Sequence, residues 1–157
     1  MDSGQKKILL VEDEDFIRDL YVRQLSKSGF QVQSAADGTT GLNTLLSDNF
    51  DLVLLDIMLP GMNGLQILRE FKTKNPTSKT IVILLTNLGQ EAVIKEGFEL
   101  GAQAYIIKAS YTPDQVVNEV KNALAGQNTG DSMPPAGTPP TTGMPPTGTP
   151  PQTPPAV

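Results

Sequence analysis

The sequence predicts an α/β fold built on a doubly wound parallel sheet. Short apolar runs alternate five times with longer segments of helical period between residues 7 and 124. Three of these runs are almost unbroken, which is typical of parallel strands covered by helices on both faces. Pro and Gly concentrate after Gly126, so we expect one domain over residues 1–126 and a separate tail over residues 127–157.

The first two strand and helix units are expected in the N-terminal third of the domain. Strands are predicted at Ile8–Val11 and Phe30–Ser34. The helix between them should span Glu14–Ser28, because its apolar residues form one stripe and Gly29 follows as a C-terminal stop. Asp37 is expected to cap the second helix, because its carboxylate can accept from the first free backbone N–H groups.

The next two strands are predicted at Leu52–Leu55 and Thr80–Leu85. Between them, apolar residues at helical spacing indicate a third helix, which should stop ahead of Pro76. The run Leu52–Leu55 is wholly apolar, as a buried parallel strand should be.

The last unit begins with a strand at Ala104–Ile107. Thr112 is placed as an N-cap, Pro113 fits the first helical position and Gln115 completes a capping box. We therefore expect a final helix that ends near Gly126.

The tail over residues 127–157 differs in composition from the domain. It holds five Pro-Pro pairs among Thr, Gly and Ala, and Asp131 is its only charged residue. Such a segment has little apolar surface to offset the entropy of ordering, so we expect disorder with extended polyproline II character. The stretch Pro151–Pro154 has the PxxP form without basic neighbours, which favours a spacer over a ligand for a polyproline-binding domain.

Composition excludes several classes of function. The chain lacks His and Cys, so any metal site must use oxygen ligands, which favours Mg²⁺, Ca²⁺ or Mn²⁺ over zinc. The net charge of -5 argues against a nucleic-acid groove. No apolar stretch is long enough to cross a membrane and no signal peptide is visible, so we expect a cytoplasmic protein without membrane association.

Residues with functional chemistry follow the predicted strands. Because ligands bind at the carboxyl ends of strands in such sheets, these side chains should converge. They are Glu12 and Asp13 after strand one, Asp56 after strand three, Thr86 after strand four and Lys108 after strand five. Three carboxylates suit a hard divalent cation, and one carboxylate attacking phosphorus would give an acyl phosphate. The metal, the ammonium group and the hydroxyl would neutralise the phosphoryl oxygens.

The segment from Asp56 to Gly64, read together with the acidic pair, Thr86 and Lys108, resembles the receiver domain of two-component response regulators. The resemblance covers Lys6–Leu124 and is closest to single-domain receivers of the chemotaxis type. It implies a flavodoxin-like sheet with strand order 2-1-3-4-5. It also implies a phosphorelay protein that catalyses only its own phosphotransfer and dephosphorylation, and is otherwise not an enzyme.

Residue by residue, the resemblance implies that Glu12 and Asp13 position Mg²⁺, with the Met58 carbonyl in the metal shell. Asp56 would be phosphorylated by a sensor histidine kinase or a phosphotransfer protein. The output would pass through protein contacts, by docking to a separate target, by dimerisation or by onward transfer of the phosphoryl group, and the sequence leaves these three open.

The resemblance further implies that Thr86 and Lys108 hold the phosphoryl oxygens and that Tyr105 is a switch residue whose ring turns inward. Ala109 replaces the proline usual after the lysine. We nevertheless expect a cis bond after Lys108, so that its side chain can turn back over Asp56. The acidic pair also begins with Glu where Asp is commoner, and the longer side chain is expected to reach the metal through water.

Three other functions would use some of the same residues. A phosphohydrolase with an Asp nucleophile would resemble Asp-x-Asp after strand one, whereas Asp56 follows strand three. A flavin site is disfavoured because acidic turns repel phosphate. A receiver-fold scaffold that is not phosphorylated, with a tail that recruits a partner, is the main alternative.

Overall fold

The computed structural model describes residues 5–87 and 91–126. Five parallel strands form one sheet in the order β2-β1-β3-β4-β5, as predicted. The strands are β1 (Lys7–Val11), β2 (Gln31–Ala35), β3 (Leu52–Asp56), β4 (Ile81–Thr86) and β5 (Ala104–Ile107). The α-helices are α1 (Asp15–Lys27), α2 (Gly38–Ser47), α3 (Gly64–Lys74), α4 (Glu91–Glu99) and α5 (Pro113–Leu124), and a 3₁₀ turn spans Lys108–Ser110.

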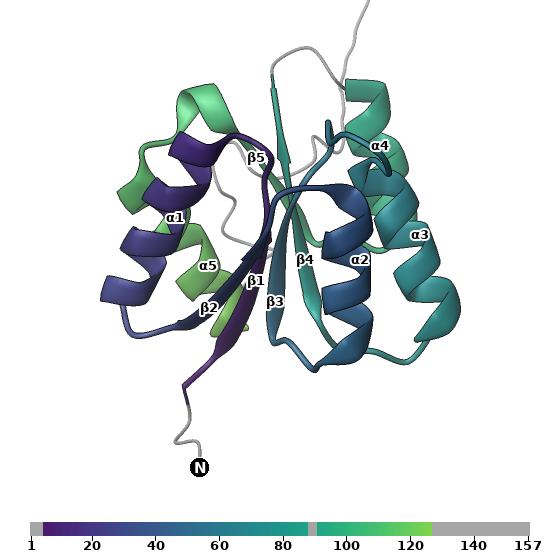
Figure 1. Cartoon of the computed structure of the whole chain (residues 1–157), viewed down its shortest axis with the longest axis horizontal. Helices are drawn as coiled ribbons and strands as arrows, with labels where there is room; N and C mark the ends of the chain where they lie inside the picture. The colour runs from purple at the N-terminus through teal and green to yellow at the C-terminus, as the bar shows by residue number, and fades with distance from the viewer. Residues whose placement is uncertain (1–4, 88–90, 127–157) are drawn as a thin grey trace, which may run out of the picture.

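Helices cover both faces of the sheet, with α1 and α5 on one side and α2, α3 and α4 on the other (Figure 1). Alternate residues of each strand therefore enter two separate cores. Ile8 and Leu10 of β1 pack with α1 and α5, whereas Leu9 and Val11 pack with α2 and α3. The central strand β3 is buried along its whole length, as its apolar sequence predicts.

Two strands begin one residue later than the sequence suggests, because their first expected residues bond elsewhere. The Phe30 N–H donates to the Leu25 carbonyl at 3.2 Å and so closes the end of α1. The Thr80 N–H donates to Ser78 Oγ at 3.1 Å, and the Thr80 hydroxyl donates to the Phe50 carbonyl at 2.8 Å. Both residues therefore precede the sheet ladder.

The expected helix signals are present. Gly29 follows α1 with a φ of +98°, a left-handed conformation that glycine adopts without strain. The Asp37 carboxylate accepts from the Thr40 N–H at 2.8 Å at the start of α2. Thr112 and Gln115 form the predicted capping box before α5. These two side-chain caps, at Asp37 and Thr112, fix where α2 and α5 start.

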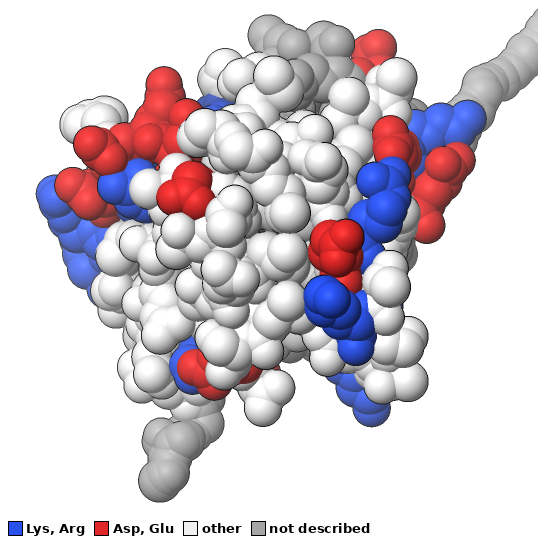
Figure 2. Space-filling view, turned by 45° about the vertical axis from the view of Figure 1, so that its right-hand side comes forward, with Lys and Arg blue, Asp and Glu red and all other residues white. Residues whose placement is uncertain are grey.

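Charged side chains are unevenly distributed over the surface. Helix α2 contains no acidic or basic residue, and the face of the molecule that it helps to cover presents a broad uncharged area (Figure 2). None of the helices in the described ranges is both long enough and apolar enough to span a bilayer. The predicted tail over residues 127–157 lies outside the described residues.

Candidate functional site

Three carboxylates meet at the carboxyl edge of the sheet. Glu12 directly follows β1 and Asp56 ends β3, and the two strands are hydrogen-bonded neighbours. One carboxylate oxygen from each of Glu12, Asp13 and Asp56 lies within 4.8 Å of the other two. Glu12 and Asp56 are buried, whereas Asp13 is exposed. A set of oxygen ligands that is buried on one side and open to solvent on the other fits a hard divalent cation such as Mg²⁺.

Glu12 is held on several sides. Its backbone N–H donates to the Ala35 carbonyl at 3.1 Å, and its Oε2 accepts from the Glu14 N–H at 3.1 Å. Burial, and then the negative charge of Asp56, raise the pKa of Glu12 to about 7, although the Glu14 N–H and Lys108 act in the opposite direction. Ionised Glu12 and Asp56 therefore repel each other in a buried position, and a bound cation would reduce this repulsion.

Asp56 is oriented by its own loop. Its Oδ1 accepts from the Met58 N–H at 3.0 Å. The chain then returns so closely that a Cβ at Gly64 would lie 2.4 Å from the Asp56 carbonyl oxygen. The site therefore requires glycine at position 64, a role that the sequence motif alone did not indicate. Met58 itself is exposed beside the carboxylate.

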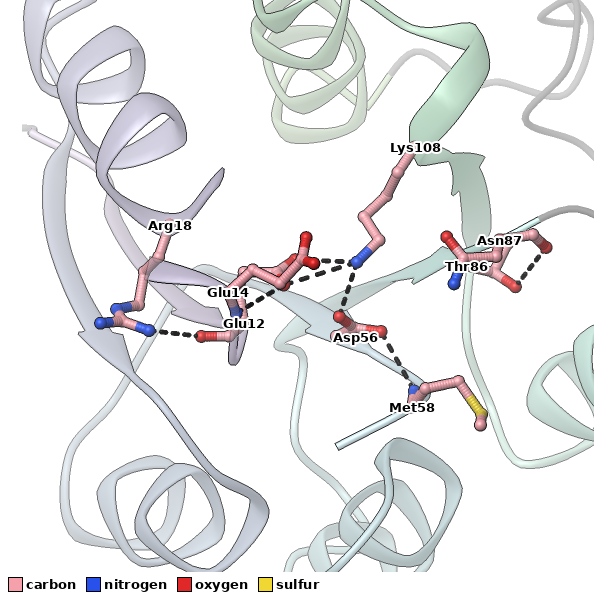
Figure 3. A network of polar contacts seen from close by, with 8 residues as sticks. All are labelled: Glu12, Glu14, Arg18, Asp56, Met58, Thr86, Asn87 and Lys108. Carbon is pink, nitrogen blue, oxygen red and sulfur yellow. Dashed lines mark hydrogen bonds and ion pairs between the residues drawn. The ribbon is translucent and has the colours of Figure 1, made fainter. Parts of the chain in front are cut away.

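Lys108 reaches across the site from the end of β5 (Figure 3). Its Nζ donates to Asp56 Oδ2 at 2.8 Å and to Glu12 Oε1 at 3.1 Å. Burial alone would lower the pKa of Lys108, but the hydrogen bond and charge of Asp56, together with Glu12, raise it above its usual value. The ammonium group therefore stays charged between two buried carboxylates.

The expected cis bond between Lys108 and Ala109 is wrong. The described residues contain no cis peptide bond, yet Lys108 still reaches Asp56. The physical reason is that the chain turns through the 3₁₀ segment Lys108–Ser110, so the lysine side chain can extend back over the sheet edge from a trans backbone. Lys108 therefore does not need a cis bond in order to turn back over Asp56.

Two further predicted residues lie on β4 and β5, the next two strands of the sheet after β3. Thr86 is buried at the end of β4, and its hydroxyl donates to the Asn87 carbonyl at 3.0 Å. Tyr105 on β5 is half-buried and contacts Phe98 edge-on, with ring centroids 6.0 Å apart. Burial, and then the charge of Glu91, raise the pKa of Tyr105. In this structure the Tyr105 ring lies next to α4.

Arg18 is a residue of the site that sequence reasoning missed. It lies one turn into α1, and its Nη1 donates to the backbone carbonyl of Glu12 at 2.9 Å (Figure 3). Its Nη2 contacts Asp15 Oδ1 at 2.5 Å. An acid and a base three apart at a helix start were the available signal, but they would have indicated an ordinary surface pair.

Comparison with known proteins gives consistent matches. A family model described as the response regulator receiver domain matches residues 8–121. The transcriptional regulatory protein ResD of Bacillus subtilis is 37% identical over 122 residues, which cover 78% of this chain and 49% of ResD. The chain thus spans about half the length of this relative.

Solved structures agree with the observed fold. A CheY-like response regulator receiver domain protein from Methanospirillum hungatei is similar with a TM-score of 0.71 and 30% identity, over 78% of this chain and 95% of that protein. The BeF3-activated receiver domain of DrrB, from Thermotoga maritima, is similar with a TM-score of 0.67 and 33% identity, over 77% of this chain and 98% of that domain.

Proposed function

From the premise that this chain belongs to the response regulator receiver domain family, we propose that it is a phosphoacceptor switch of a two-component system. Asp56 takes a phosphoryl group from a partner histidine kinase or phosphotransfer protein, and the output passes through protein contacts. The observation that carries this proposal is the Lys108 ammonium group bonded to both Asp56 and Glu12, beside a group of three carboxylates.

Mg²⁺ is the proposed cofactor. Asp13 and Asp56, with Glu12 and the Met58 carbonyl, would hold it, because together they offer only oxygen ligands and carry excess negative charge. The bound ion supplies positive charge that reduces the repulsion between the carboxylates and an incoming phosphoryl group. The exposed position of Asp13 leaves the site open toward solvent, from which the phosphoryl donor must approach.

Asp56 is the proposed nucleophile. A carboxylate oxygen of Asp56 forms a bond to phosphorus, and the bond between phosphorus and the donor breaks, with its electron pair leaving on the donor. The Met58 N–H holds the other oxygen of Asp56 and so fixes the direction of attack. Lys108, which already donates to Asp56, transfers its hydrogen bond to a phosphoryl oxygen and neutralises its charge.

Thr86 and Tyr105 are the proposed route by which phosphorylation reaches the surface. Both lie on strands next to the site, at β4 and β5, and Tyr105 packs against Phe98 of α4. A Thr86 hydroxyl that moves from the Asn87 carbonyl to a phosphoryl oxygen vacates space, into which the tyrosine ring turns. The surface formed by α4 and β5 then changes shape for a partner.

Beryllium trifluoride, an analogue of a phosphoryl group on a carboxylate, tests this function without a cognate kinase. Fluorine NMR should detect a bound species when BeF₃⁻ and Mg²⁺ are both added to the full chain. The signal should be absent without Mg²⁺ and in Asp56→Asn, while Asp19→Asn, an exposed acid on α1, serves as the matched control. A bound signal of equal size in Asp56→Asn would contradict the assignment of the phosphoacceptor.

A further inference from the structure

The loop that carries Asp13 is tied at both ends by one side chain, Arg18. This loop joins the end of β1 to the start of α1. Arg18 Nη1 donates to the Glu12 carbonyl at 2.9 Å, and Nη2 contacts Asp15 Oδ1 at 2.5 Å. The Arg18 side chain is only 17% exposed, so the guanidinium group lies against the loop and is not extended into solvent.

The two contacts of Arg18 differ in strength. The Asp15 side chain is 86% exposed, so solvent and salt weaken its attraction to Arg18. The Glu12 carbonyl lies in a partly buried position just beyond the last residue of β1. A partly buried carbonyl still needs a donor, and Arg18 supplies one to the Glu12 carbonyl. The contact with the carbonyl is therefore the stronger of the two.

This contact bears on Asp13 through the geometry of the peptide unit. The Glu12 carbonyl and the Asp13 N–H belong to the same planar group, so fixing the direction of one fixes the other. The Glu12 N–H is held by Ala35, and its carboxylate by Glu14 and Lys108. Arg18 fixes the remaining polar group of Glu12. Asp13 itself is exposed and has no burial to hold it in place.

We propose that Arg18 is a positioning residue, which holds the loop between β1 and α1 so that the Asp13 carboxylate faces Glu12 and Asp56. The proposal rests on the proposed function, since it assigns the loop to a Mg²⁺ site. Arg18 acts through the Glu12 carbonyl and does not itself touch the metal. Lysine should replace it only in part, because its ammonium group lacks the planar guanidinium fork that directs one N–H at the Glu12 carbonyl.

Calorimetric titration of the full chain with MgCl₂ tests this role, with metal-free melting temperatures measured in parallel. Arg18→Met removes the donors and the charge, and it should weaken Mg²⁺ binding about tenfold, the scale expected for groups that orient metal ligands. Arg18→Lys keeps the charge and should weaken binding several-fold. Asp15→Ala removes only the exposed contact and should change the affinity less than Arg18→Lys does.

Arg69 provides a matched control, because it is an exposed arginine paired with Glu96 at 2.8 Å on α3 and α4, outside the site. Arg69→Met should bind Mg²⁺ like the wild type. Unchanged affinity in Arg18→Met, an equal loss in Arg69→Met, or full affinity in Arg18→Lys would each overturn the proposal. If Arg18→Met does not fold, Arg18→Lys decides alone. A wild-type chain that binds no Mg²⁺ would instead refute the proposed function, and the positioning role with it.

Discussion

The ammonium group of Lys108 donates a hydrogen bond of 2.8 Å to Asp56, although the two residues lie 52 positions apart in sequence. The same nitrogen lies 3.1 Å from Glu12. The lysine side chain is 11% exposed and both carboxylates are almost fully buried. In the absence of metal, this internal cation is therefore the group that offsets the charge of the two acids.

Replacing Lys108 by alanine should destabilise the metal-free protein. Removing one partner of a fully buried ion pair costs about 3–5 kcal/mol, and we expect roughly 1–3 kcal/mol here because Glu12 can take up a proton. Urea unfolding in the presence of a chelator measures the loss. Lys95→Ala, at an exposed lysine on α4, is the control, and an equal effect of the two substitutions would contradict the role of Lys108.

The raised pKa of Glu12 predicts a dependence of metal-free stability on pH. The folded pKa of about 7 lies above the ordinary value of 4.5, so between these values the folded state binds more protons than the unfolded state. Stability from this group is fully present below about pH 4.5 and is lost as the pH rises through about 7, by roughly 3 kcal/mol.

Glu12→Gln should remove this component. Urea unfolding at pH 5 and pH 7.5 in a chelator should show a larger loss of stability in the wild type than in Glu12→Gln. Other acids contribute to the pH dependence of both proteins alike, so the difference between the two losses of stability isolates the contribution of Glu12. Equal losses of stability in the two proteins would show that the Glu12 carboxyl group titrates normally.

Asp13 should be required for stabilisation by Mg²⁺. An ion that binds only the folded state stabilises it by mass action, by about 2.7 kcal/mol at a concentration one hundred times the Kd. Millimolar Mg²⁺ should therefore raise the melting temperature of the wild type and of Asp19→Asn, but not that of Asp13→Asn. The same Mg²⁺ shift in all three proteins would mean that the ion binds elsewhere.

Most of the fold followed from local patterns. The unbroken run Leu52–Leu55 and the capping box at Thr112 act through burial and local hydrogen bonds, which sequence spacing records directly. The rule that ligands bind at the carboxyl ends of parallel strands then predicted that Asp56 and Lys108 lie close together, as they do in the structure. These predictions needed only periodicity and topology.

Other features depend on where individual backbone groups point, and spacing does not record this. The contact of Arg18 with the Glu12 carbonyl and the trans bond after Lys108 both belong to this class. The one-residue shift at Phe30 has the same origin, since its N–H closes α1 and does not join the sheet. The expected cis bond was wrong because Lys108 reaches Asp56 from a trans backbone, and residue 109 is alanine and not the proline that would favour a cis bond.

We propose that residues 1–126 form the receiver domain and that residues 127–157 are a spacer. Deleting residues 127–157 should leave the melting temperature and the BeF₃⁻ signal unchanged, because both described cores are built from residues before Gly126. Calorimetric melting of the full and shortened chains measures this. A markedly lower melting temperature in the shortened chain would show that the tail packs on the domain.

Intact-mass spectrometry after incubation with acetyl phosphate tests the central claim most directly. The full chain should gain the mass of one phosphoryl group only when Mg²⁺ is present, and fragmentation should place it on Asp56. The adduct should be labile, as an acyl phosphate is, and absent from Asp56→Asn under the same conditions. An adduct of equal yield in Asp56→Asn, or no adduct in the wild type with Mg²⁺, would contradict the account of this protein as a phosphoacceptor.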